Sequence, residues 1–257
     1  MNENLRTERD SIGTLAVPED AYYGVQSLRA YRNFRITGQG LHPFLIQNIV
    51  RIKKAAAIVN EKIGRLDPQK AQAILAACDE ILNGAYADAF IVDAVQGGAG
   101  TSANMNVNEV IANRAIEILG GRKGDYSVVH PNDHVNLAPS TNDVIPTAGK
   151  MTVIDLMQPL LLSLHMLALS FDGKAKEFDD IVKMGRTQLQ DAVPVRLGQE
   201  FAAYAAVVRR DIGRIEAAER EMHAVNLGGS AIGTSINVPP EYLENITRVL
   251  SGICGYE

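Results

Sequence analysis

Cysteine, tryptophan and positive charge are the scarce features of this 257-residue sequence, which has two cysteines, no tryptophan and 5% aromatic residues. Cys78 and Cys254 lack the spacing of a disulfide or zinc framework, so both kinds of scaffold are excluded. Cys78 falls on the apolar stripe of a helical pattern and is predicted to be a buried, reduced thiol. With 25 Lys and Arg against 30 Asp and Glu, the net charge is −5. Nucleic acid is not expected as a partner, because the basic excess that binds its backbone is missing.

The first residues lack the apolar stretch of an export signal. Residues 1–10 are polar and charged, which predicts a cytoplasmic location. Residues 151–171 approach the length of a transmembrane helix, but they contain Asp155, Gln158 and His165. Such residues are costly in a bilayer, so the pattern favours a buried helix of a soluble protein, and no membrane partner is expected.

Helical periodicity is present almost throughout the sequence. Apolar residues on one face predict helices over residues 43–64, 67–84 and 105–119. Asp67 is the predicted N-cap of the second helix, because Pro68 follows it at the first helical position. Before residue 43 the pattern is mixed, and a short hairpin is predicted there.

Two longer segments, residues 153–171 and 201–222, space their apolar residues alternately by four and three. This heptad-like spacing without turn signals predicts long antiparallel bundle helices. The predicted fold is mainly α: a small mixed and helical N-terminal domain over residues 1–140, then the first part of a long-helix bundle over residues 141–257. Two bundle helices leave apolar faces uncovered, so we expect either oligomerisation through these faces or a longer natural chain.

Glycine and small polar residues interrupt the amphipathic pattern in three segments, namely QGGAGTSANMN (96–106), PSTND (139–143) and GRTQLQDAVP (185–194). Glycine lets a backbone approach a ligand, and a helix N-terminus presents free N–H groups that suit a carboxylate. Hydroxyl and amide groups can hold a carboxylate or an ammonium group. The alternative is structural, because the first two segments also read as helix caps and the third as a plain connector.

A metal pair is the alternative interpretation of His130 and His134, which flank Asp133. The segment contains Pro131, and no third ligand or cysteine cluster accompanies it. No metal site is therefore predicted.

Four motifs carry a family resemblance over nearly the whole chain, namely GGAGTSANMNVNEVIANR (97–114), HPNDHVN (130–136), STND (140–143) and GRTQLQDAVP (185–194). Together they resemble the aspartase/fumarase superfamily. Within it, Asp93 before QGGAGT, Thr141 and Gln188 are similar to aspartate ammonia-lyases. Class II fumarases usually have Trp with TGSGT, Ser-Ser-Asn and His at these places.

The resemblance implies reversible elimination of ammonia from L-aspartate to give fumarate, with no organic cofactor and no metal in the site. Removing a proton beside the β-carboxylate places a second negative charge on that group, which fixed donors must stabilise. By family match, Thr101, Ser140 and Thr141 supply hydroxyl donors to the β-carboxylate, Asn142 and Thr187 hold the amino group and α-carboxylate, and Gln188 orients them. In the family, three subunits of a homotetramer contribute these loops, so the expected partners are a dicarboxylate and further copies of the chain.

Three departures from the family pattern stand out. Pro139 stands where Gln is frequent, and Ser235 ends the segment GGSAIGTS (228–235) where Gly is usual. The family's Gly-Ser-Ser loop, which carries the serine base together with a Lys and an Asn, is absent. No catalytic residue is therefore predicted in this chain, and its 257 residues are expected to be the inactive N-terminal part of a longer lyase. The alternatives are a class II fumarase and a non-catalytic helical fragment that oligomerises.

Overall fold

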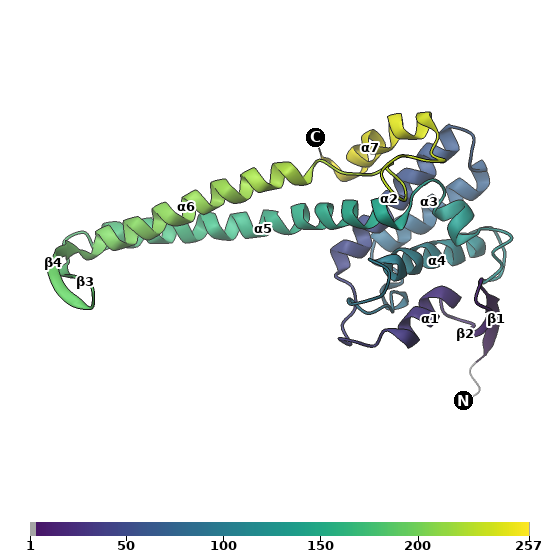
Figure 1. Ribbon diagram of the computed structural model, residues 1–257, viewed down its shortest axis with the longest axis horizontal. Coiled ribbons are helices and arrows are strands. Elements are labelled where there is room, and N and C mark those ends of the chain that lie inside the picture. Colours follow the sequence, from purple (N-terminus) through teal and green to yellow (C-terminus); the bar gives the residue numbers. More distant parts are fainter. Residues whose placement is uncertain (1–3, 257) are drawn as a thin grey trace. The chain divides into compact units, whose positions relative to one another are not determined.

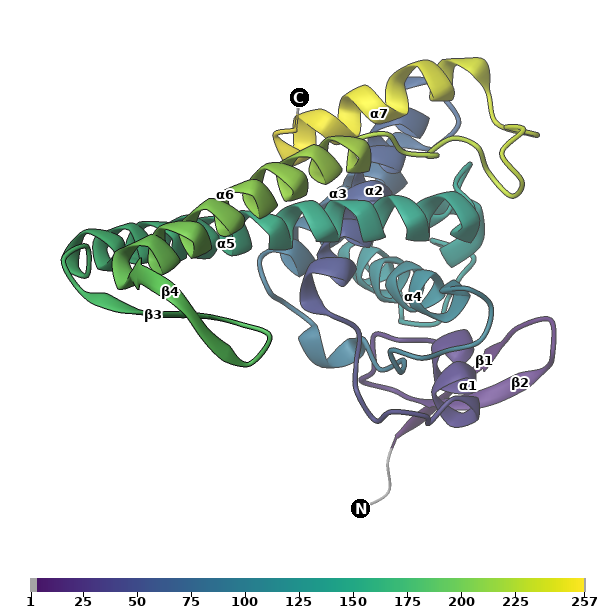
Figure 2. The same cartoon turned by 60° about the vertical axis from the view of Figure 1, so that its left-hand side comes forward.

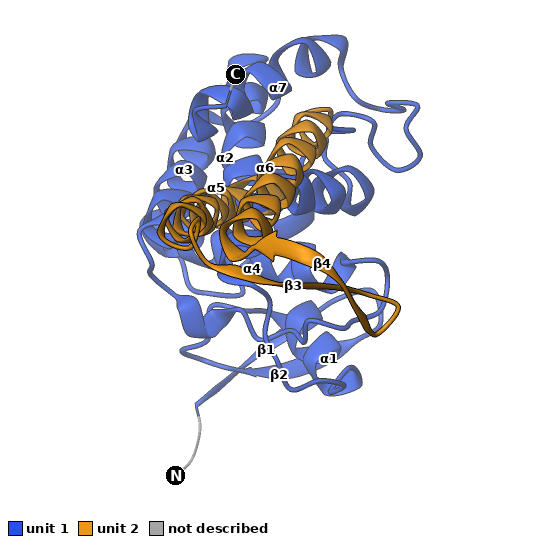
Figure 3. Ribbon diagram, turned by 90° about the vertical axis from the view of Figure 1, so that its left-hand side faces the viewer, with its two compact units in different colours: residues 1–152, 225–257 blue, residues 153–224 orange. Residues whose placement is uncertain are grey.

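The computed structural model describes residues 4–256, which fold into two compact units. Unit 1 comprises residues 1–152 and 225–257, and unit 2 comprises residues 153–224 (Figure 3). The predicted mainly α fold is confirmed. The predicted domains 1–140 and 141–257 are a different division of the chain and stay a prediction.

The elements are given below in chain order, and Figure 1 labels the α-helices and the strands. They are β1 (Leu5–Arg9), β2 (Thr14–Pro18), α1 (Val25–Asn33), α2 (Pro43–Lys62), α3 (Pro68–Leu82), the 3₁₀ turn η1 (Ala87–Ala89), α4 (Thr101–Ile118), the π-helical turn η2 (Pro131–Val135), α5 (Thr141–Glu177), β3 (Val182–Thr187), β4 (Gln190–Arg196), α6 (Leu197–Met222) and α7 (Pro240–Cys254).

Local sequence signals explain where most of the helices begin. Asp67 caps α3 as predicted, because its carboxylate accepts hydrogen bonds from the backbone N–H groups of Gln69 and Lys70 at 3.0 and 3.1 Å. Helix α4 begins at Thr101, four residues before the predicted start at Met105. Its first turn is polar, yet no side chain caps it at Gly100. The amide of Asn104 in this turn donates to Thr141 Oγ1 of another segment and so does not compete for the helical backbone.

The core of unit 1 lies among α2, α3, α4 and α7, with the first turns of α5. It includes Ile49, Ile74, Ile111, Val144 and Ile246, each with no exposed surface. Cys78 is fully buried in the same core, as predicted, and within residues 4–256 neither Cys78 nor Cys254 forms a disulfide.

The N-terminal residues of unit 1 form the predicted hairpin, in which β1 pairs antiparallel with β2 from Leu5 opposite Pro18 to Arg9 opposite Thr14. The hairpin packs on α1 through a small cluster made of Val17, Val25 and Leu28.

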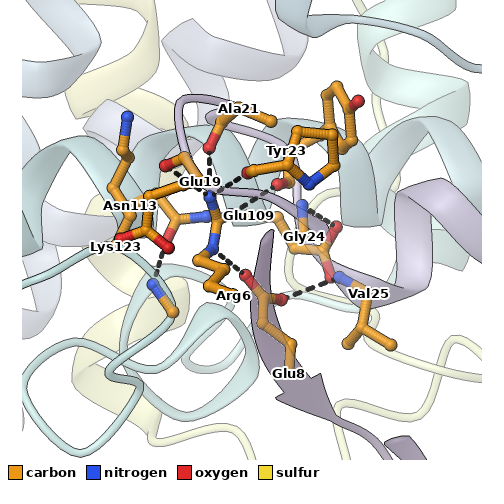
Figure 4. A network of polar contacts seen from close by, with 12 residues as sticks. Arg6, Glu8, Glu19, Ala21, Tyr23, Gly24, Val25, Glu109, Asn113 and Lys123 are labelled. Carbon is orange, nitrogen blue, oxygen red and sulfur yellow. Dashed lines mark hydrogen bonds and ion pairs between the residues drawn. The ribbon is translucent and has the colours of Figure 1, made fainter. Parts of the chain in front are cut away.

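Two buried carboxylates close the N-terminus of α1, as Figure 4 shows. Glu8 comes from β1 and Glu109 from α4, and together they accept hydrogen bonds from four consecutive backbone N–H groups, those of residues 24–27, at 2.8–3.0 Å. The N–H groups of a first helical turn have no partner within the helix, so this arrangement satisfies them. Burial raises the pKa of Glu109 to about 7, although the hydrogen bonds from Ser27 and Gln26 oppose that rise. Arg6 lies 2.8 Å from Glu8 and forms an ion pair with it.

Unit 2 consists of the rest of α5, the hairpin β3–β4 and α6 (Figure 2). The two helices run antiparallel, because Phe171 lies 5.7 Å from Tyr204 between ring centroids while Gln158 donates to Glu219 at 3.1 Å. The predicted helix pair is therefore confirmed. Between the helices, the sequence indicated a plain connector or a site, and the structure has a two-stranded hairpin with a bulge between Met184 and Arg186.

Apolar side chains of unit 2 are widely exposed within this chain. Those more than half exposed on α5 are Leu162, Met166 and Leu169. In the part of the chain that the structure describes, α5 is the one helix long and apolar enough to cross a membrane by length and composition, and 22% of its apolar window is buried. The burial that we expected for residues 151–171 is thus not supplied by this chain.

Candidate functional site

The glycine-rich loop before α4 is a closed, packed structure. Gln96 holds both of its ends, because its amide donates to the Asp93 carbonyl at 3.0 Å and accepts from the Ala103 N–H at 2.6 Å. Gly100 has a φ of +94°, a region that side chains disfavour. A Cβ at Gly97 would lie 2.5 Å from Phe34 Cζ, and one at Gly100 would lie 2.9 Å from Ile145. Packing therefore requires glycine at both positions, and the backbone conformation requires it at Gly100 as well.

Asp93 anchors the entry to this loop. Its carboxylate accepts hydrogen bonds from the backbone N–H groups of Thr37, Gly38 and Val95 at 2.8–2.9 Å and from the Thr37 hydroxyl at 2.8 Å. Desolvation opposes ionisation, but these donors outweigh it and lower the pKa of Asp93 to about 2. The residue that the sequence singled out as similar to aspartate ammonia-lyases is thus an ionised anchor of the loop.

Thr101 lies at the first position of α4 with its side chain exposed. Its hydroxyl donates to the Gly98 carbonyl at 2.5 Å. To donate to a substrate carboxylate, this hydroxyl must turn away from the loop backbone.

Ser140, Thr141 and Asn142 form one turn at the start of α5, and Asp143 fixes that turn. The Ser140 N–H donates to Asp143 Oδ1 at 2.8 Å. Thr141 Oγ1 accepts from the Asn104 amide at 3.1 Å, which leaves the Thr141 hydroxyl proton free to point at a ligand. Because Asn104 lies one turn after Thr101 on α4, and Ile145 of α5 packs on Gly100, the first two predicted segments come together within unit 1.

Asn142 contacts a distant segment of the same unit. Its Nδ2 donates to the Ala231 carbonyl at 2.8 Å, and Asn226 Nδ2 donates to the Asn142 carbonyl at 3.1 Å. The Asn142 amide therefore uses its donor within the fold. Its acceptor oxygen, the group that an ammonium requires, is not used by this contact.

Thr187 and Gln188 lie in unit 2, at the tip of the hairpin β3–β4, and both are exposed. Gln188 and Leu189 have φ values of +49° and +64°, so the tip is a tight turn of two left-handed residues. Thr187 and Gln188 thus belong to unit 2, whereas the other four predicted substrate-binding residues belong to unit 1.

Sequence reasoning missed Lys53, which has no exposed surface on α2. Its ammonium donates to Asn136 Oδ1 at 2.5 Å, and Asn136 donates to the Pro139 carbonyl just before the predicted turn. Burial lowers the pKa of Lys53 to about 7, while the charge of Asp143 opposes that change. The available signal was the position of Lys53, four residues after Ile49 on the apolar face of the helix.

The histidines of η2 take part in local bonding. His130 Nδ1 accepts from the N–H groups of Asn132 and Asp133 at 3.2 Å, and His134 Nδ1 accepts from the His130 N–H at 2.7 Å. Burial and the nearby charge of Lys70 lower the pKa of His134, which favours its neutral form. Within residues 4–256, no three His, Cys, Asp or Glu side chains are grouped as metal ligands.

Comparison with known families agrees with this arrangement of polar turns on helix starts. A family profile described as "Lyase" matches residues 13–256. The chain belongs to this lyase family. Its resemblance to the aspartase/fumarase superfamily is confirmed, and among its relatives aspartate ammonia-lyases are prominent.

Two curated relatives of this chain are aspartate ammonia-lyases from Bacillus. That of Bacillus sp is 49% identical over 256 residues, which covers 100% of this chain and 55% of the relative. That of Bacillus subtilis (strain 168) is 50% identical over 253 residues, covering 98% and 53%. The chain therefore spans about half the length of the curated relatives it matches.

Solved structures of similar proteins share the fold. The fumarate lyase:delta crystallin of Brucella melitensis, solved bound to cobalt, superposes with a TM-score of 0.96 at 49% identity over 99% of this chain and 56% of that one. A recombinant class II fumarase from Schistosoma mansoni superposes with a TM-score of 0.91 at 35% identity over 98% of this chain and 53% of that one.

Proposed function

We propose that the full-length protein is an aspartate ammonia-lyase, which eliminates ammonia reversibly from L-aspartate to give fumarate. The observation that carries this proposal is the identity of 49% and 50% to two aspartate ammonia-lyases along essentially the whole chain. A class II fumarase, which eliminates water instead of ammonia, is the second candidate. It is less favoured because the fumarase from Schistosoma mansoni is only 35% identical to this chain.

The proposed chemistry depends on hydrogen-bond donors placed around the β-carboxylate. When the neighbouring proton leaves, that carboxylate becomes doubly charged, and each fixed donor contributes about 3 kcal/mol of transition-state stabilisation in such sites. Thr141 is best prepared for this role, because Asn104 already occupies an acceptor position of its hydroxyl. Ser140 and Thr101 complete the proposed donor set, and Asn142, Thr187 and Gln188 are proposed to orient the amino group and the α-carboxylate.

Residues 1–257 are proposed to supply only some of the side chains that the reaction requires. The family's serine base loop is not in this sequence. General-base catalysis contributes roughly 10²- to 10⁴-fold to rate, so the 257-residue chain should release no measurable ammonia by itself. The competing hypothesis is a non-catalytic helical fragment that oligomerises. The exposed apolar side chains of α5 support it.

The test is to follow fumarate by its ultraviolet absorbance with L-aspartate and, separately, with L-malate. Both the 257-residue chain and the full-length gene product are assayed. Fumarate from aspartate, formed only by the full-length protein, supports the proposal. Fumarate from malate alone would favour the fumarase, and a full-length protein inert to both substrates would refute both candidates.

A homotetramer in the cytoplasm is the proposed setting of the full-length enzyme. The uncovered apolar side chains of α5 support assembly of several copies. Cys78 and Cys254 form no disulfide within residues 4–256, which is compatible with a reducing compartment. Light scattering of the purified full-length protein and fractionation of cells that produce it test the two parts of this proposal.

A further inference from the structure

The carboxylate of Asp143 joins two segments of unit 1 that are far apart in the sequence. It has no exposed surface, and its Oδ2 accepts hydrogen bonds from the backbone N–H groups of Gly228 and Ser230 at 3.1 and 2.9 Å. Its Oδ1 accepts from the Ser140 N–H at 2.8 Å. One buried side chain therefore holds the proposed donor turn, residues 140–142, against the segment 226–231.

Two amide contacts repeat the same connection at the surface. Asn142 donates to the Ala231 carbonyl, and Asn226 donates to the Asn142 carbonyl. Four hydrogen bonds in all join Asn142 and Asp143 to the segment 226–231. This bonding also fixes a strained backbone, because Ser230 has a φ of +57°, in the left-handed region that glycine prefers.

The connection needs a carboxylate rather than an amide. All three groups that meet Asp143 are N–H donors, and an Asn in its place would turn one NH₂ group towards donors. Two buried ionisable groups, the ammonium of Lys53 on α2 and the Tyr242 hydroxyl on α7, have pKa values that respond to Asp143. A fully buried side chain that accepts three backbone N–H bonds at the base of the donor turn indicates a specific role for it.

We propose that Asp143 is the positioning residue of the substrate site, which seats Ser140, Thr141 and Asn142 on the segment 226–231. This segment is then part of the site's framework, although none of the residues assigned to substrate lies in it. The inference rests on the proposed function. Asp143 acts through the turn and does not touch the substrate.

The experiment compares three variants of the full-length protein. D143N removes the central acceptor, and N226A removes a surface bond of the same connection with little risk to folding. N245A is the matched control, because Asn245 is a partly exposed Asn of the same unit whose amide donates to the Glu241 carbonyl of α7. Hydrogen–deuterium exchange of residues 139–144 and 226–231 is expected to accelerate together in D143N and N226A and to stay unchanged in N245A.

The kinetic arm uses Thr141 as the reporter. A misplaced donor turn should lower kcat/KM for L-aspartate by about 100-fold in D143N, mainly through kcat, and by less in N226A. In a protein that already carries T141V, N226A should lower kcat/KM by a smaller factor than it does alone, because both changes disable the same donor.

Unchanged exchange in both segments of N226A, or full additivity of N226A with T141V, would overturn the inference. If D143N does not fold, N226A still decides it. If the unaltered full-length protein is inert to aspartate and to malate, the proposed function fails, and the exchange data alone then decide whether Asp143 positions the turn.

Discussion

Lys53 illustrates at the scale of one residue how burial links charge to stability. The lysine pKa falls from 10.5 to about 7 on folding, so between these values the folded state binds fewer protons than the unfolded state. The contribution of Lys53 to the free energy of unfolding should therefore increase as pH rises from about 7 to 10.5. The increase is at most about 1.4 kcal/mol per pH unit. Below pH 7 Lys53 is protonated in both the folded and the unfolded state, so the full cost of burying its ammonium opposes folding.

Urea unfolding of wild type and K53M across this pH range checks the prediction. The stability of wild type relative to K53M should improve as pH rises. K54M is the control, because Lys54 is partly exposed and pairs with Asp79. A constant difference between wild type and K53M would contradict the prediction.

Ser235 provides a second prediction at this scale. Its φ of +57° is left-handed, which explains why the family usually has Gly at this position. S235G should relieve that strain and raise the free energy of unfolding by about 0.5–1 kcal/mol, after the greater freedom of glycine in the unfolded chain is subtracted. Thermal unfolding measures the change, and a lower midpoint in S235G would show that the Ser235 side chain stabilises the loop.

At the scale of an element, the start of α1 depends on close approach between segments. A Cβ at Gly24 would lie 2.2 Å from the Tyr126 hydroxyl oxygen and 2.7 Å from Glu8 Oε2. G24A should therefore push apart the carboxylates that accept from this helix start and lower the free energy of unfolding by about 3 kcal/mol. G40A is the control, since a Cβ at Gly40 meets nothing within 4 Å. Equal unfolding midpoints for the two variants would rule out this account.

The helices were largely predictable because their signals are local. The cap at Asp67, the proline after it and the heptad spacing of α5 and α6 all lie within a few residues of the structure they specify. The first turn of α4 was missed, since its small polar residues resemble a loop until their distant partners are known. Asn104 illustrates this, because its amide donates to Thr141 Oγ1, 37 positions further along the chain.

The site was predictable only as separate polar segments. Sequence motifs located Thr101 and residues 140–142, but nothing local indicated that Asp143 would bond to residues 228 and 230. Glu109 is similar, because its partners lie more than 80 positions away in the chain. Contacts of this kind depend on the packed fold, which one sequence without relatives does not specify.

At the scale of the whole molecule, the exposed apolar side chains of α5 predict self-association. Leu162 and Leu169 are 66% and 61% exposed, which is unfavourable unless another surface covers them. Introducing L162E and L169E together should shift the full-length protein towards smaller species in sedimentation velocity. The pair D155N and D172N, on the same helix, is a control that adds no charge to an apolar position. An unchanged assembly in the glutamate variant would indicate that this face stays uncovered.

Unit 2 interrupts unit 1, since the chain leaves unit 1 after residue 152 and returns to it at residue 225. Asp143 and the segment 226–231 close unit 1 across that interruption. We therefore expect insertions and deletions in the helical pair of unit 2 to be tolerated, because the residues that close the junction lie in unit 1 and keep their bonds.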